Sequence, residues 1–212
     1  GDILRFRPEE TNWTTRDRFI LSKGHSSIAL YVILADLGFF PFQDLETFCK
    51  PGTRLGGHSD RSIPGIECST GSLGNGLSIA SGIALAGKLD NKDYLTIALL
   101  GDGECQEGSV WEAAMFASQH KLSKLIAIVD YNSQGATDFI DDSVSLEPLE
   151  SKWNSFGWDV QKIKGHSFTE LLRSFGNLHT RNSSNPLAII AHTTKGKGVS
   201  FMEDQLGWHH RI

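Results

Sequence analysis

The 212-residue chain lacks most of the features that place a protein in a special class. It has no apolar run of 18 residues, which argues against a membrane span, and its first ten residues do not have the pattern of a signal peptide. It has no cluster of Lys or Arg, and a formal net charge of −5 argues against nucleic-acid binding. Its three cysteines are scattered and odd in number, which indicates neither a disulfide framework nor a zinc site and is typical of a reducing, cytoplasmic setting.

The stretch from residue 95 to residue 134 carries the clearest structural pattern. Leu95–Leu100 is a short apolar run that ends at Gly101, and Leu125–Val129 is a second run, so both predict buried strands. Apolar residues at helical spacing between Val110 and Ser118 predict a helix that connects them. Two strands joined in this way are parallel. We therefore predict an α/β fold with a parallel sheet flanked by helices, in a single domain over residues 1–212.

Similar patterns extend the prediction to the rest of the chain. We expect helices at residues 28–37, 77–89 and 168–178, a short surface helix at 41–50, the continuation of a helix at 153–157, and strands at 158–163 and 187–191. The segment 193–198 follows the last strand, so it lies at the carboxyl edge of the sheet, where open α/β sheets bind ligands.

Two polar side chains follow the first two strands at that same edge. Asp102 offers a carboxylate and Asn132 an amide oxygen, and the backbone carbonyl of Gln134 can supply a third oxygen. Three protein oxygens suit an octahedral Mg²⁺ that takes its other ligands from phosphates and water. Gly103 lets the backbone approach a phosphate at the start of a helix. The sequence therefore predicts a metal and phosphate site here, whereas the simplest alternative is a Gly-Asp turn and an Asn loop cap.

This motif resembles one found in a known family. Gly101-Asp102-Gly103, with Asn132 after the next strand, is similar to the diphosphate-binding motif of thiamine diphosphate (ThDP) enzymes. The segment GDGECQEGSVWEA resembles the corresponding segment of the transketolase family. The segments SKGH at 22–25, GGH at 56–58 and TKGKG at 194–198 match that family in order and spacing. The resemblance implies the ThDP-binding fold of the diphosphate-binding type, with ThDP and Mg²⁺ as cofactors. It also implies transfer of a two-carbon ketol unit from a ketose to an aldose.

The resemblance assigns roles to individual residues. His25 would transfer protons or orient the substrate beside the ThDP ring, and His58 would reach substrate hydroxyls from a loop in which Ser59 stands where Pro is usual. Gly71, Leu73 and Gly74 would contact the cofactor rings, and His209 would face the diphosphate or a substrate phosphate. The implied catalytic residues are His25, His58, Glu107 and His209; the implied cofactor contacts are His25, His58, Gly71, Leu73, Gly103, Glu107, Asn132 and His209; the implied metal ligands are Asp102, Asn132 and Gln134.

Several of these residues also have plain structural interpretations. His25 could satisfy backbone groups at a helix start, and Lys195 could be a solvated lysine. Glu107 and Glu112, which match acids at the family's subunit interface near the cofactor, could be capping or solvated residues. Cys105 has no base paired with it in the sequence, and the cofactor itself performs the covalent chemistry, so we do not assign it as a nucleophile.

The resemblance also implies a missing half of the site. In the family, the glutamate that activates the cofactor belongs to a second, pyrimidine-binding domain, which 212 residues cannot hold. We therefore expect an N-terminal, diphosphate-binding subunit of a split transketolase, inactive without a C-terminal partner subunit. We expect the small residues Ala113, Ala114 and Ala117 to form part of that interface, and we expect the chain to lack an N-terminal stretch because a Gly-His-Gly-type turn is absent.

Other functions remain open from the sequence. The same cofactor could serve a deoxyxylulose-type synthase or a 2-oxoacid dehydrogenase, although the SKGH and TKGKG phrases argue against the dehydrogenase. A protein that only assembles or regulates a complex is an alternative of another class, and a test of ThDP and Mg²⁺ binding separates it from the enzymes. The expected substrates are sugar phosphates or related ketoses and aldoses, and the sequence does not identify the sugar.

Overall fold

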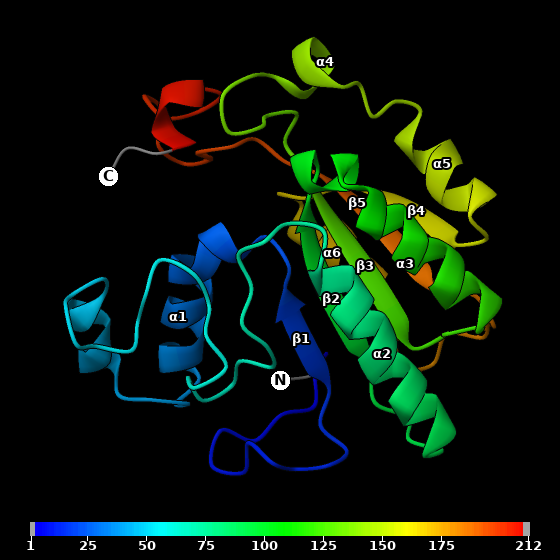
Figure 1. Cartoon of the computed structure of the whole chain (residues 1–212), viewed down its shortest axis with the longest axis horizontal. Helices are drawn as coiled ribbons and strands as arrows, with labels where there is room; N and C mark the ends of the chain where they lie inside the picture. The colour runs from blue at the N-terminus through cyan, green and yellow to red at the C-terminus, as the bar shows by residue number, and fades with distance from the viewer. Residues whose placement is uncertain (1–2, 210–212) are drawn as a thin grey trace.

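The computed structural model describes residues 3–209 and contains one parallel β-sheet (Figure 1). The strands are β1 (Arg18–Leu21), β2 (Thr96–Gly101), β3 (Leu125–Tyr131), β4 (Asp159–Lys164) and β5 (Leu187–His192). They lie in the order β1-β2-β3-β5-β4, and every neighbouring pair is parallel. The predicted α/β fold with a parallel sheet is confirmed.

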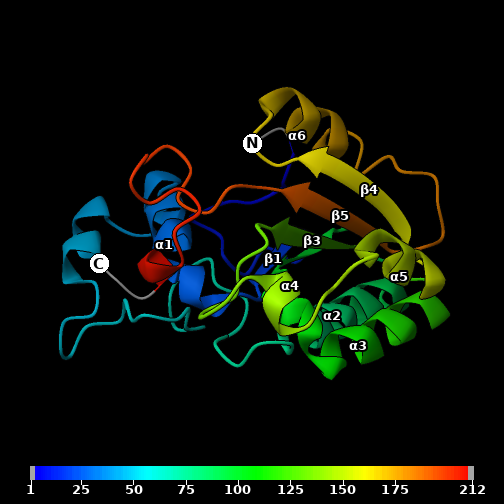
Figure 2. The same ribbon diagram turned by 90° about the horizontal axis from the view of Figure 1, so that it is seen from above.

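Helices cover both faces of this sheet (Figure 2). The α-helices are α1 (Ser27–Asp36), α2 (Gly76–Leu89), α3 (Gly108–Gln119), α4 (Ile140–Ser143), α5 (Leu149–Ser155) and α6 (Phe168–Phe175). Short 3-10 turns are η1 (Gly24–Ser26), η2 (Phe42–Thr47), η3 (Gly103–Gln106) and η4 (Leu206–His209). Helices α2, α3 and α5 pack on one face, and α6 packs on the other.

The apolar strand residues divide between the two faces by their alternation. One core joins the sheet to α2, α3 and α5 and includes Ala98, Leu100, Ala127, Val129, Ala188, Ile190 and the fully buried Trp153. The other core joins the sheet to α6 and includes Ile97, Ile126, Leu187 and Ile189. Burial on both faces explains why the central strands read as continuous apolar runs rather than as alternating ones.

The structure differs from the sequence-based expectations at several places. The short helix expected at 41–50 is the 3-10 helix η2, and α4 was not predicted. Strand β1 was not predicted, because it has only four residues, begins with a charged Arg18 and pairs on one side only, with β2. The expected interface role of Ala113, Ala114 and Ala117 is wrong, because all three are buried in the chain's own core. On α3 the exposed apolar residues are instead Met115 and Phe116. Among the described residues, no helix is long and apolar enough to cross a membrane.

The close packing of α2 on the end of β1 yields a stability prediction. A Cβ added at Gly76 would lie 2.5 Å from the Cβ and 2.7 Å from the Cα of Ser22, so backbone would have to move. We expect Gly76→Ala to destabilise the chain by about 1–3 kcal/mol. Gly82→Ala, in the same helix with no atom within 4 Å of its added Cβ, is the matched control and should stabilise by about 0.5–1 kcal/mol. Urea unfolding of both variants measures this difference, and equal effects at the two positions would contradict the packing argument.

Candidate active site

A cavity of about 780 Å³ opens at the carboxyl ends of the strands. Its walls come from the turn after β2, the loop after β3, the segment after β5 and η4; in Figure 1 this C-terminal segment, orange to red, lies near the loop that precedes α4. Of the residues singled out in the sequence, the cavity is lined by His25, Leu73, Asp102, Gly103, Glu107, Asn132, Gln134, Lys195 and His209. His58, Gly71 and Gly74 are not part of this lining.

The ends of β2 and β3 hold the predicted metal ligands side by side. Asp102 is buried; its Oδ1 accepts a hydrogen bond from the Gly103 N–H at 2.8 Å, and its Oδ2 accepts one from the Ser133 N–H at 2.5 Å. The carboxylate has about four lone-pair sites, so both oxygens retain the capacity to bind a cation. Burial raises the pKa of Asp102, although the backbone hydrogen bonds oppose this.

The turn after Asn132 contains an unusual buried amide. The Asn132 Oδ1 accepts a hydrogen bond from the Gln134 N–H at 3.0 Å, which tightens the turn. Gln134 is 4% exposed, and within the described part of the chain neither its Oε1 nor its Nε2 has a hydrogen-bond partner. A buried amide without partners is costly, which is consistent with a site that is completed by a polar ligand.

Glu104 is a site residue that the sequence analysis missed. Its buried carboxylate accepts hydrogen bonds from the Ser22 hydroxyl, from the Gly74 N–H at 2.9 Å and from the Gly101 N–H at 3.1 Å. These three partners come from the segments after β1, before α2 and at the end of β2. Burial raises the pKa of Glu104. Its place directly after the Gly-Asp-Gly turn is the one signal in the sequence that could have drawn attention to it.

A second pairing that the sequence did not reveal lies beside Asp102, at the end of β3. The Lys23 Nζ lies 2.6 Å from the Asp130 Oδ2, and the Thr193 hydroxyl donates to the other oxygen. Burial opposes ionisation of Asp130, but the Lys23 ammonium and these hydrogen bonds hold its pKa below the ordinary value. His166 also lines the cavity, and its Nε2 accepts the Thr194 N–H at 2.7 Å.

The imidazole rings of His25 and His209 contact each other at the cavity wall. Their ring centroids are 5.4 Å apart, and the Nδ1 of His209 is hydrogen-bonded to the Lys195 Nζ. Desolvation at the cavity wall, together with the positive charges of Lys23, His209 and Lys195, lowers the pKa of His25 to about 4. His25 is therefore neutral at pH 7 and can both donate and accept a hydrogen bond.

The remaining candidates lie outside or at the rim of the cavity. His58 is exposed and packs on Gly71, where an added Cβ would lie 3.0 Å from the His58 Cδ2. Glu107 occupies the N-cap position of α3 without a side-chain capping hydrogen bond and lines the cavity, whereas Glu112 is exposed on α3 and is not part of the lining. Cys105 is fully buried and burial raises the pKa of its thiol, so the structure agrees that it is no nucleophile.

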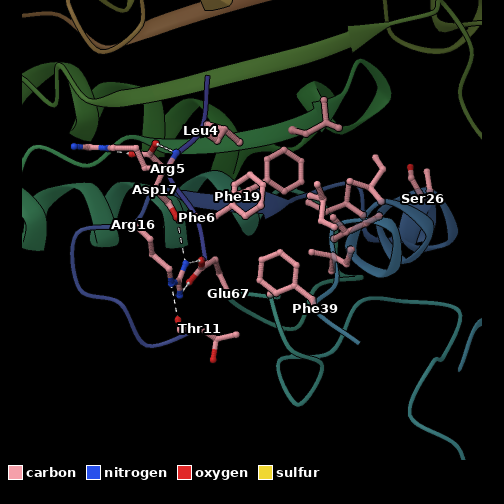
Figure 3. A pocket seen from close by; sticks show the side chains of 18 residues that line it. Leu4, Arg5, Phe6, Thr11, Arg16, Asp17, Phe19, Ser26, Phe39 and Glu67 are labelled. Atoms are coloured by element: carbon pink, nitrogen blue, oxygen red, sulfur yellow. Dashed lines mark hydrogen bonds and ion pairs between the residues drawn. The ribbon is translucent and has the colours of Figure 1, made fainter. Parts of the chain in front are cut away.

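A second, smaller cavity does not have the chemistry of an active site. It measures about 280 Å³ and lies between α1, β1 and the N-terminal segment (Figure 3). Figure 3 shows the rings of Phe6, Phe19 and Phe39 around it. Its charged groups are already paired, as in the Arg16–Glu67 ion pair. The cavity at the strand ends, with its convergent polar groups, is therefore the candidate site.

Known proteins share this sequence and this fold. A family model described as the transketolase, thiamine diphosphate binding domain matches residues 1–210. The chain is 44% identical over 211 residues to one of the subunits of the apulose-4-phosphate transketolase of Phocaeicola vulgatus, covering 100% of this chain and 75% of that protein. It is 44% identical over 209 residues to the 6-deoxy-6-sulfo-D-fructose transketolase subunit SqwG of Clostridium sp. (strain MSTE9), covering 98% of this chain and 76% of that protein.

Solved structures agree with these sequence matches. A transketolase of Pichia Stipitis superposes with a TM-score of 0.89 at 29% identity, over 97% of this chain and 32% of that chain. The transketolase of Campylobacter jejuni gives a TM-score of 0.85 at 30% identity, over 96% of this chain and 34% of that chain. The chain thus spans about a third of the solved transketolases and most of the length of the separate subunits. It belongs to the transketolase family, as a thiamine diphosphate binding domain.

Proposed function

We propose that this chain is the diphosphate-binding subunit of a split transketolase, which transfers a two-carbon ketol unit from a ketose to an aldose together with a pyrimidine-binding partner subunit. The observation that carries the proposal is the 44% identity, over the whole chain, to proteins named as transketolase subunits. The same matches favour ketol transfer over the three alternatives, which are a deoxyxylulose-type synthase, a 2-oxoacid dehydrogenase and a protein that only assembles or regulates a complex. The substrates we propose are sugar phosphates or related sugars, and the three free cysteines of the described chain favour a cytoplasmic location.

The residues at the strand ends fit a hydrated Mg²⁺ bound to the ThDP diphosphate. Within residues 3–209 no group of three His, Cys, Asp or Glu side chains could hold a metal. The proposed ligands are those of the Gly-Asp-Gly…Asn motif: Asp102, the Asn132 amide oxygen and the Gln134 carbonyl, with diphosphate and water as the remaining ligands. The buried Gln134 amide, which has no hydrogen-bond partner in the described chain, supports a polar ligand at this turn.

The remaining residues have roles in binding and proton transfer. When bound, ThDP supplies the carbanion chemistry that breaks and forms a bond beside a carbonyl group. Lys195 is proposed to supply positive charge, and Lys195 and His209 hydrogen-bond donors, to phosphate oxygens. Neutral His25 is proposed to accept a proton from a substrate hydroxyl and, once protonated, to return it to a substrate oxygen. Leu73 and Glu107 are proposed to border the cofactor. When the partner subunit is bound, His58 is proposed to approach the substrate and Gly71 the cofactor; both lie beside the cavity.

The direct test is reconstitution. The chain is combined with ThDP, Mg²⁺ and a pyrimidine-binding subunit, and ketol transfer from a ketose phosphate to an aldose phosphate is followed. Activity is expected only when both subunits are present. If the assembly binds the cofactor but shows no ketol transfer, the result would favour the synthase or the dehydrogenase reaction instead. An assembly that binds no cofactor would leave only the structural role.

Asp102 provides a test of the metal site. Asp102→Ala should lower the Mg²⁺-dependent affinity of the assembly for ThDP by at least about 100-fold, since even groups behind metal ligands contribute 10–100-fold. Asp102→Asn keeps a hydrogen-bond acceptor but removes the charge, so it should show most of the same loss. Asp142→Asn, at an exposed position of α4, is the control. Calorimetric titration measures the affinities, and an unchanged value for both Asp102 variants would refute the assignment.

His25 provides a test of the proton-transfer role. His25→Ala should lower kcat by about 10²–10⁴-fold, the range for a lost acid–base group, and should leave ThDP affinity nearly unchanged. His120→Ala, at the end of α3 where the ring stacks on Phe116, is the control. Steady-state kinetics and cofactor titration of the reconstituted complex measure both effects. If turnover is unaffected, His25 has only a structural role.

A further inference from the structure

The loop that carries His58 is held by hydroxyl groups of helix α1. The Ser27 hydroxyl donates to the Gly57 carbonyl at 2.9 Å. The Tyr31 hydroxyl lies 2.8 Å from the His58 carbonyl and 3.0 Å from the Gly56 carbonyl, and shares its one proton between them. Ser27 and Tyr31 are each 1% exposed and lie one turn apart on the same side of α1.

A second attachment fixes the residue after His58. The Ser59 and Thr70 hydroxyl oxygens are 2.6 Å apart, and the Thr70 N–H donates to the Ser59 carbonyl at 3.1 Å. Ser59 is 2% exposed. A proline at this position would have no hydroxyl for the contact. The loop is therefore held on one side by α1 and on the other by the segment that contains Gly71. We call Ser27, Tyr31, Ser59 and Thr70 the hydroxyl clamp.

The hydroxyl clamp connects His58 to His25. Helix α1 begins two residues after His25, so the helix that holds the His58 loop also continues the His25 turn. Gly24 also packs on Thr70, where an added Cβ would lie 2.7 Å from the Thr70 Oγ1. His58 is also among the groups that lower the pKa of His25, so the two imidazoles are within electrostatic reach.

We propose that Tyr31 is a positioning residue that, within the hydroxyl clamp, holds His58 in place relative to His25 and so sets the affinity for the sugar substrate, not for the cofactor. This inference rests on the proposed ketol transfer and on the proposed substrate contact of His58. The metal ligands are fixed separately, by the ends of β2 and β3. Loss of the Tyr31 hydroxyl should therefore affect substrate binding and leave ThDP and Mg²⁺ binding intact.

The test is Tyr31→Phe in the complex reconstituted with the partner subunit. This change removes the hydroxyl and keeps the ring that packs on Phe48. We expect KM for the sugar phosphate to rise about five- to tenfold, the effect of one hydrogen bond, with a smaller change in kcat and no change in ThDP affinity. Tyr94→Phe is the matched control, because its hydroxyl also donates to a backbone carbonyl, that of Ile83 at 3.1 Å, away from the cavity.

Two further measurements separate positioning from general stability. In a His58→Ala background, Tyr31→Phe should raise KM no further, whereas an equal additional rise would overturn the inference. In the chain alone, Tyr31→Phe should speed hydrogen exchange of the Thr70 amide, which bonds to the Ser59 carbonyl. Unchanged exchange would refute the hydroxyl clamp even if the wild-type complex proved inactive, in which case the proposed function fails separately.

Discussion

The arrangement of the candidate site depends on the buried carboxylate of Glu104. It accepts hydrogen bonds from the Ser22 hydroxyl, the Gly74 N–H and the Gly101 N–H, which belong to segments far apart in the chain. A buried, ionised carboxylate is stable only when hydrogen-bond donors replace the lost water. The three segments that carry these donors are therefore held in fixed positions around Glu104. The turn that leads to His25, the loop that presents Leu73 and the strand end that presents Asp102 are thereby fixed relative to one another.

Two carboxylates at neighbouring strand ends have opposite environments. Asp130 is paired with Lys23, and its pKa is lowered. Asp102 is buried, forms no ion pair in the described part of the chain, and its pKa is raised. The positive charge that Asp102 lacks is one that a metal ion would supply, which supports its proposed role as a Mg²⁺ ligand.

The sequence predicted the parts of this structure that local pattern determines. The β2–α3–β3 unit, and with it the positions of Asp102 and Asn132 at one edge of the sheet, follows from short apolar runs and helical spacing. The functional roles came from resemblance to a family, not from periodicity. Glu104, the Lys23–Asp130 pair and strand β1 were missed, because each depends on partners distant in sequence: Lys23 and Asp130 are 107 positions apart. Spacing places residues at a strand end, but it does not show which side chains meet there.

The two groups of site residues are held by different kinds of interaction. The proposed metal ligands follow strands whose hydrogen-bond ladders fix them, so changes elsewhere in the loops leave them in place. His58 belongs to an irregular loop whose position depends on a few hydroxyl contacts, so substitutions such as Ser for the usual Pro at position 59 can alter it without loss of the fold. Two relatives with the same 44% identity are named for different sugars, apulose-4-phosphate and 6-deoxy-6-sulfo-D-fructose. If the proposed roles hold, a cofactor site fixed by strands and a substrate loop fixed by side chains would let the sugar contacts of this domain change while the cofactor contacts stay.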